Sequence, residues 1–211
     1  RLLTLSARAR AEQLGDLYGA ISDWRRVLED LPEELEALRA LDALFERTGQ
    51  PAELVDVIRR RAALCDDAEA RAAMIIRLAE LQETALRRID DAIDTFVGLR
   101  MEASDTDVRA HAALARLYAE LERWDALVEV LEDYAERTPD LDERAALRFK
   151  AAQVYEVRLG RPAEAVRCVR AVLDDAPGDT KALAELDRLL TAMDDVVGLV
   201  EALELRAAAA Q

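Results

Sequence analysis

The sequence predicts an all-α fold built from about six successive helix–turn–helix units. Three observations predict it: a helix-favouring composition, a short pattern that recurs six times, and prolines and glycines at fixed places in that pattern. The chain has 211 residues, of which 52% are hydrophobic and only 4% aromatic, and it contains no asparagine. Alanine, leucine, arginine and glutamate dominate, and this mixture favours helices throughout.

The recurring pattern predicts the second helix of each unit. Six nine-residue segments align without gaps and begin at residues 16, 50, 88, 123, 161 and 195, so that their starts are separated by 34, 38, 35, 38 and 34 residues. The fifth residue is small or apolar and the ninth is bulky, in the pairs Ala20/Trp24, Leu54/Ile58, Ala92/Phe96, Leu127/Leu131, Ala165/Val169 and Leu199/Leu203. A spacing of four places both on one helical face.

A further helix precedes these segments. It is marked by residue pairs at helical spacing, namely Leu41/Phe45, Leu78/Gln82, Leu114/Tyr118, Ala152/Tyr155 and Leu186/Leu190. The predicted units are therefore residues 1–32, 33–66, 67–104, 105–139, 140–177 and 178–211. We expect them to form a single solenoid over residues 1–211. Since the chain begins with Arg1 and ends on an apolar, alanine-rich stretch, we expect it to be a fragment of a longer chain.

Prolines and glycines fit the same frame. Two prolines begin second helices, where a missing N–H costs little, at Pro51 and Pro162. Three prolines follow the small-residue position by twelve residues, where the second helix must end, at Pro32, Pro139 and Pro177. Three glycines fall in the turns between paired helices, at Gly15, Gly49 and Gly160.

The units also alternate. The first, third and fifth carry alanine at the small position, and the others carry leucine. Starts of the same parity lie 72 or 73 residues apart (16 to 88 to 161, and 50 to 123 to 195). We infer a two-unit supermotif and expect the longer units to accommodate their extra residues in loops.

The chain resembles the tetratricopeptide repeat family, whose unit is 34 residues. The family's pattern in the first helix, helix A, is matched by Leu78-Ala79 and by Leu114-Ala115 with Tyr118. Its alanine in the second helix, helix B, and its closing proline are matched by Ala20, Ala92, Ala165, Pro32, Pro139 and Pro177. The resemblance covers essentially the whole chain and implies a right-handed superhelical solenoid of such repeats.

The resemblance also implies a protein-binding scaffold whose helix A residues line a concave surface. Carried over residue by residue, that surface holds Arg8, Ala43, Glu80, Arg116, Gln153 and Arg188, with Arg39, Phe149, Lys150 and Lys181 nearby. We expect this basic surface to accept an acidic segment or a C-terminal carboxylate of a protein partner. The family's carboxylate-clamp members use asparagine, which this chain lacks, so that specificity is not expected. The alternative is that the arginines are solvated or paired with neighbouring acids.

Charge and composition exclude several classes of function. A net charge of −15 opposes binding to nucleic acid and to anionic bilayers. No apolar run approaches the ~20 residues needed to span a membrane, so direct membrane insertion is not expected. Cys65 and Cys168 form neither a disulfide framework nor a metal-ligand pattern. They leave the compartment open and favour the cytoplasm.

No catalytic, cofactor-binding or metal-ligating set is expected. His111 is the only histidine, so a Cys/His metal set cannot form, and we expect it to pack or to lie at the surface. Cys168 is expected to be a small apolar filler within a helix. Trp24, Phe96 and Trp124 occupy repeat-phased positions, which favours packing between helices over a ligand box.

Three functional hypotheses follow from this frame, beside the interaction scaffold that leads. The second is a structural module that packs against itself or its own chain through uncapped ends, giving a homo-oligomer. The third is a pentatricopeptide-type RNA binder, against which the acidic charge and the uneven spacing argue. A helical-toroid enzyme is the fourth, and carboxylate pairs alone do not make its site.

Overall fold

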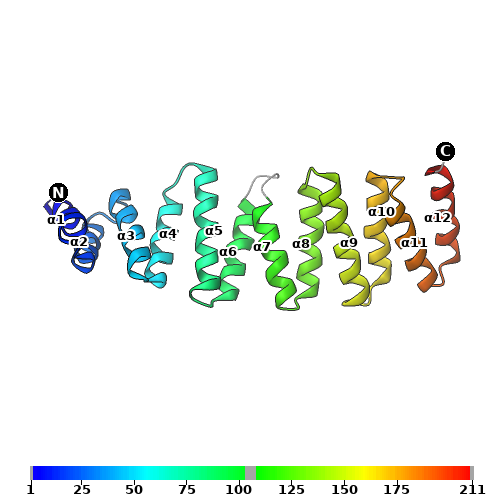
Figure 1. Cartoon of the computed structure of the whole chain (residues 1–211), viewed down its shortest axis with the longest axis horizontal. Helices are drawn as coiled ribbons and strands as arrows, with labels where there is room; N and C mark the ends of the chain where they lie inside the picture. The colour runs from blue at the N-terminus through cyan, green and yellow to red at the C-terminus, as the bar shows by residue number, and fades with distance from the viewer. Residues whose placement is uncertain (1, 103–107, 210–211) are drawn as a thin grey trace. The chain divides into compact units, whose positions relative to one another are not determined.

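The computed structural model describes residues 2–102 and 108–209, without the side chains of residues 205, 208 and 209. Within this part of the chain the regular elements are all helices, and they fall into two compact units, Arg1–Glu102 and Ala103–Gln211. In each unit, helices adjacent in sequence stand side by side (Figure 1). The protein is therefore an all-α helical repeat solenoid.

The N-terminal unit contains three helical hairpins. The helix A members are α1 (Leu2–Ala9), continued by the π-helical turn η1 (Arg10–Leu14), then α3 (Leu35–Thr48) and α5 (Ala68–Thr84). The helix B members are α2 (Leu17–Asp30), α4 (Pro51–Ala63) and α6 (Ile89–Glu102). One continuous apolar cluster runs from Ala7 of α1 to Leu78 of α5. Each hairpin is thus covered by the next, as in a stack.

The C-terminal unit repeats the arrangement. Its helix A members are α7 (Arg109–Glu120), α9 (Leu141–Val157) and α11 (Thr180–Ala192). Its helix B members are α8 (Trp124–Arg137), α10 (Pro162–Asp175) and α12 (Val196–Ala209).

The repeat-phased pairs of helix B are buried in five of the six B helices that the structure describes, as predicted. Ala20 with Trp24, and the corresponding pairs of α4, α6, α8 and α10, are each no more than 3% exposed. The sixth pair departs from the prediction. Leu199 is half-buried and Leu203 is 58% exposed, because no further helix of the described chain packs against α12.

Prolines delimit the helices as the sequence predicts. Pro51 and Pro162 occupy the first turn of α4 and α10. The other three prolines follow the last residues of α2, α8 and α10 by two positions. Helices α5, α9 and α11 begin at an aspartate whose carboxylate accepts a backbone N–H of the first turn, at Asp67, Asp140 and Asp179.

Every hairpin turn has a residue with left-handed backbone conformation, at Gly15, Gly49, Arg87, Glu122, Gly160 and Asp194. The N–H of the following residue donates to a backbone carbonyl of helix A, and the number of residues between donor and acceptor alternates along the chain. The bond spans six residues in the first, third and fifth hairpins, as in Asp16 to Arg10, and five in the others, as in Gln50 to Phe45. The two-hairpin supermotif inferred from the sequence is thus also present in the backbone of the turns.

The placement of the extra residues in the longer units was predicted wrongly. They lie in helix A: α5 and α9 have 17 residues, whereas α3, α7 and α11 have 14, 12 and 13. An insertion of about 3.6 residues adds one full helical turn, which keeps the apolar stripe on the same face. A loop is therefore not needed to absorb it.

Some expectations about the array stay predictions. They are the right-handed superhelix, the single solenoid domain over residues 1–211 and the six repeat boundaries. The boundary expected between residues 104 and 105 lies outside the described residues.

Candidate functional site

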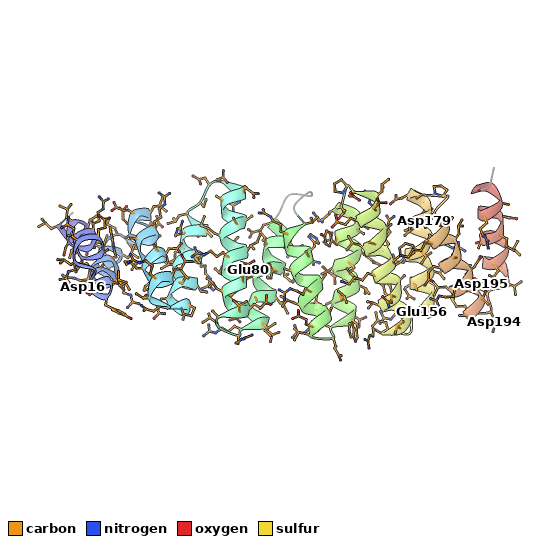
Figure 2. The ribbon with its side chains drawn as sticks, viewed as in Figure 1. Asp16, Glu80, Glu156, Asp179, Asp194 and Asp195 are labelled. Atoms are coloured by element: carbon orange, nitrogen blue, oxygen red, sulfur yellow. The ribbon has the colours of Figure 1, made fainter. Side chains whose placement is uncertain are left out.

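The structure places all the candidate contact residues on A helices. Arg8 lies on α1, Arg39 and Ala43 on α3, and Glu80 on α5 of the N-terminal unit. The C-terminal unit holds the others, which are Arg116 on α7, Phe149, Lys150 and Gln153 on α9, and Lys181 and Arg188 on α11. Phe149 is half-buried, and the other candidates are exposed, namely Arg8, Arg39, Ala43, Glu80, Arg116, Lys150, Gln153, Lys181 and Arg188. In each unit we call the solvent-facing side of its A helices the helix A face; Figure 2 labels Glu80 of the N-terminal unit and Glu156 of the C-terminal unit.

The N-terminal candidates do not form a cluster. Arg8 of α1 donates from Nε to Glu36 of α3 over 2.7 Å, so its charge is matched by the next helix A. Arg39 has no ion pair among the described residues. Burial lowers the pKa of Arg61, and the positive charge of Arg39 lowers it further. Glu80 is exposed, and its backbone carbonyl accepts from the Thr84 hydroxyl.

Two of the C-terminal arginines are engaged by carboxylates. Arg116 lies 3.3 Å from Glu120, one turn along α7. Arg188 of α11 donates to both carboxylate oxygens of Glu156 on α9, at 2.9 and 2.6 Å, and also to Glu185. The hydrogen bonds to Glu185 and Glu156 raise the pKa of Arg188 further. Arg188 therefore links consecutive A helices, and the surface is less basic than its arginines imply.

Four candidates remain together at the α9–α11 pair. The Lys181 ammonium lies 4.2 Å from the centroid of the Phe149 ring, a cation–π contact between the two helices. Gln153 follows Phe149 by one turn on α9, and Lys150 is the residue directly after Phe149. Neither lysine takes part in an ion pair within the described residues. We call Phe149, Lys150, Gln153 and Lys181 the lysine patch.

Sequence reasoning missed an inter-repeat ion cluster in the N-terminal unit. Asp42 of α3 is 4% exposed and contacts Arg61 of α4 through one carboxylate oxygen. Its other oxygen accepts from Arg77 of α5 over 2.9 Å. One carboxylate thus joins three helices of two successive hairpins. The repeated Leu-Asp at 41–42 and 186–187 was the available signal.

Two grooves lie between successive B helices of the same unit, one between α2 and α4 and one between α4 and α6. Their volumes are about 310 and 300 Å³. Arg60 lines the first and donates to the Pro32 carbonyl over 2.5 Å. In the second groove, Gly98 occupies the position that aligns with Arg60 of the first. The residues that line the second groove include Ile75, Leu78 and Leu99. The second groove is therefore the more apolar.

His111 is fully buried within its hairpin. Its Nε2 lies 2.8 Å from Asp133 of α8, and its ring lies 5.8 Å from that of Tyr134. Burial alone would raise the pKa of Asp133, but hydrogen bonds from Arg137 and His111 outweigh it and hold that pKa low. Of the two roles expected from the sequence, packing or a place at the surface, His111 therefore has the packing role.

Cys168 of α10 is buried, and its thiol donates to Glu132 over 3.5 Å. Burial, and then the charge of Glu132, raise the pKa of the thiol to about 12, which suppresses thiolate chemistry. Trp24 and Phe96 are buried between packed helices. Trp124 is half-buried, and Cζ of Arg158 lies 4.8 Å from the centroid of the Trp124 ring. Within the described residues no group of three or more potential metal ligands occurs.

The described helices include none that combines the length and hydrophobicity required to cross a bilayer. This finding concerns only the part of the chain that the structure describes.

Comparisons with known proteins give structural likenesses only. No family model and no curated protein matches the sequence. Among solved structures, MamA is 15% identical with a TM-score of 0.38, covering 96% of this chain and 92% of that one. BtubC (BKLC) from P. vanneervenii is 17% identical with a TM-score of 0.42, covering 95% and 92%. A thermophilic tetratricopeptide protein of Thermus thermophilus is 17% identical with a TM-score of 0.36, covering 90% and 98%.

The fold assignment rests on this chain's own geometry. The described residues form paired helices with buried repeat-phased positions, and a left-handed residue stands in every turn between paired helices. Prolines begin and follow the B helices where the repeat requires them. The chain is an array of tetratricopeptide-like helical hairpins.

Proposed function

We propose that the protein is an interaction scaffold that binds a peptide segment of a protein partner on a concave helix A face. The lysine patch is its central contact in the C-terminal unit, and Arg8, Arg39, Glu80, Arg116 and Arg188 are the further candidate contacts. The observation that carries this proposal is the Lys181–Phe149 contact beside Lys150 and Gln153.

The chemistry of the patch favours a segment with a carboxylate. The only two lysines of the chain lie on consecutive A helices, α9 and α11, and neither forms a salt bridge among the described residues, although the charge of Lys181 helps to lower the pKa of Glu185. Phe149 offers apolar area, and Gln153 can both donate and accept hydrogen bonds. Arg188 contributes by fixing α9 against α11 through Glu156, which keeps the patch in one arrangement.

A peptide series tests the proposal. Labelled peptides that differ only in Asp and Glu against Asn and Gln are titrated with the full chain, and binding is followed by fluorescence anisotropy. We expect the acidic member to bind, with an affinity that falls as salt rises. Lys181→Glu should weaken binding at least about fivefold, corresponding to about 1 kcal/mol.

The matched control is Arg26→Glu, which makes the same charge change at an exposed residue of α2, a B helix. It should leave the affinity within about twofold, since long-range charge effects are screened. Equal binding of acidic and neutral peptides, or equal losses in both variants, would contradict the proposal.

A second candidate function is self-assembly through the ends of the array. It is favoured by exposed apolar side chains on the first and last described helices, including Leu2 and Leu5 of α1 and Val197 of α12. Sedimentation velocity over a range of concentrations tests it. A concentration-independent monomer would count against this function, whereas a growing series of oligomers would support it.

A further inference from the structure

Helices α4, α5 and α6 of the N-terminal unit align without gaps to α8, α9 and α10 of the C-terminal unit (Figure 1). Helices α5 and α9 both have 17 residues and begin after an aspartate, Asp67 and Asp140. The B-helix segments start at residues 50 and 88 in the first set and at 123 and 161 in the second, so every residue shifts by 73 positions. The groove between α4 and α6 can therefore be compared with its counterpart residue by residue.

The C-terminal unit fills the corresponding place with a side chain of its own. Arg148 of α9 donates to the backbone carbonyl of Ala171 over 2.5 Å and to the carboxylate of Asp175 over 2.6 Å, both on α10. Its side chain is only 19% exposed. Arg167 of α10 also donates to Glu132 of α8 over 2.6 Å, which joins the two B helices. A guanidinium thus occupies this part of the surface of α10.

The N-terminal unit keeps the acceptors and lacks the cation. The residues that correspond to Arg148, Ala171 and Asp175 are Ile75, Gly98 and Glu102. All three line the groove of about 300 Å³. A Cβ at Gly98 would meet no atom within 4 Å, so the groove is open above this residue. Glu102 is exposed and has no ion pair among the described residues.

The charged residues farther along the groove are unpaired as well. Arg59 of α4 and Asp94 of α6 take the places of Glu132 and Arg167, so the two charges are exchanged between the helices. Neither Arg59 nor Asp94 forms an ion pair within the part of the chain that the structure describes. The salt bridge that joins the B helices in the C-terminal unit therefore has no equivalent at this place in the N-terminal unit.

An arginine already present in the groove does not prevent a second one from binding beside it. Arg71 of α5 lines the groove and donates to the Cys65 carbonyl over 3.0 Å. Arg144, at the same place in α9, lies 3.2 Å from Asp175, which also accepts from Arg148. In the C-terminal unit one carboxylate thus accommodates two guanidinium groups.

We propose that the groove between α4 and α6 binds an arginine side chain from a basic segment of a partner protein. The guanidinium donates to the Gly98 carbonyl and to Glu102, which correspond to the two acceptors of Arg148. Its methylene stem packs on Ile75 and Leu99, which line the groove. The acidic groove residues Asp94 and Glu102, together with the net charge of −15, favour a basic segment.

This groove differs from the lysine patch in position and in charge preference. It lies between B helices of the N-terminal unit, whereas the lysine patch lies on A helices of the C-terminal unit. The lysine patch suits a carboxylate, and the groove suits a guanidinium. The inference therefore does not depend on the proposed binding of an acidic peptide.

The probe is a fluorescein-labelled short peptide with one arginine between two leucines in a glycine and serine background. It is titrated with the full chain and followed by anisotropy, and we expect saturable binding. Replacing the arginine by norleucine, which keeps an apolar stem without the charge, should weaken binding at least about tenfold. Lysine should weaken it less, because an ammonium retains the charge but not the planar fork of donors.

Two variants of the chain test the location. Gly98→Leu fills the groove and should abolish binding, whereas Ala163→Leu, at an exposed position of α10, should leave the affinity within about twofold. Ile75→Arg supplies the guanidinium from the chain itself, as Arg148 does, and should also abolish binding. Ile75→Met, of similar volume and without charge, should retain it. Circular dichroism checks that each variant keeps the helical content of the parent.

A double-mutant cycle tests the contact with Glu102. Against the Glu102→Gln chain, which retains the side-chain shape, the arginine and norleucine peptides should differ by no more than about threefold, because the charge pair that distinguishes them is gone. Glu136→Gln makes the same change at an exposed residue of α8 and is the matched control. It should preserve the tenfold difference between the two peptides.

Three results would overturn the inference. The first is equal affinity of the arginine and norleucine peptides for the parent chain, or no saturable binding of either. The second is undiminished binding to Gly98→Leu. The third is self-association of the chain that Gly98→Leu abolishes and the arginine peptide cannot displace, which would assign the groove to a second copy.

Discussion

Hairpins α3–α4 and α11–α12 share one sequence frame and differ in their surroundings. Ile58 and Leu203 occupy equivalent places on α4 and α12, yet the first is fully buried and the second mostly exposed. The identity of the residue does not determine this difference, since both are large and apolar. In a stack of hairpins, burial at such a position is conferred by the following helix A. An apolar repeat position therefore reports the presence of a neighbour.

The largest expected difference in stability is between substitutions at Ile58 and at Leu203. Ile58→Asp should lower the free energy of unfolding by at least about 3 kcal/mol, because it buries a charge. Leu203→Asp should change it by less than about 0.5 kcal/mol, as at other exposed sites. Urea denaturation followed by circular dichroism measures both. Similar losses in the two variants would show that α12 is covered in solution.

Substitutions at Asp42 and Asp187 should give a difference in stability of intermediate size between the two hairpins. Asp42→Ala removes the acceptor shared by Arg61 and Arg77, which are partly exposed, and should cost about 2 kcal/mol of unfolding free energy. Asp187→Ala removes one pair at a half-open site and should cost under about 1 kcal/mol. The same denaturation experiment compares them, with Asp→Asn variants as controls for side-chain volume. A larger loss at Asp187 than at Asp42 would contradict this ranking.

The turns give the smallest effect, with opposite signs in the two hairpins. Gly49 has φ 66° and Asp194 has φ 55°, a region in which a Cβ is disfavoured. A Cβ at Gly49 meets no atom within 4 Å, so Gly49→Ala should lower stability by about 1 kcal/mol through backbone strain alone. Asp194→Gly should raise it by about 0.5 kcal/mol. Thermal melts at matched concentration measure both, and shifts of the same sign would contradict the shared turn geometry.

Most of the fold was predictable from the sequence because its causes are local. The pairs such as Ala20 and Trp24 fix which helical face is buried, and Pro51 fixes where α4 begins. The length of α5 and α9 was not predictable in the same way. An insertion of one helical turn preserves the apolar phase, so a long helix and a long loop leave the same pattern.

The candidate site was less predictable because charge pairing between helices depends on tertiary distances. Arg188 and Lys181 are both cations on α11, and only the structure shows that Arg188 bonds Glu156 while Lys181 lies over Phe149. The Asp42 cluster was missed for the same reason, since Arg77 comes from the next hairpin. A residue's position on helix A could be read from spacing, but the partner of its charge could not.

The alternating reach of the turn bonds, six residues and then five, has a consequence for how such an array can lengthen. Duplicating one hairpin would place two turns of the same kind in succession and mismatch the helix lengths on either side. Duplicating two neighbouring hairpins would preserve the alternation at both junctions. Growth of this architecture by gene duplication should therefore proceed in even steps, and an engineer extending it should copy pairs.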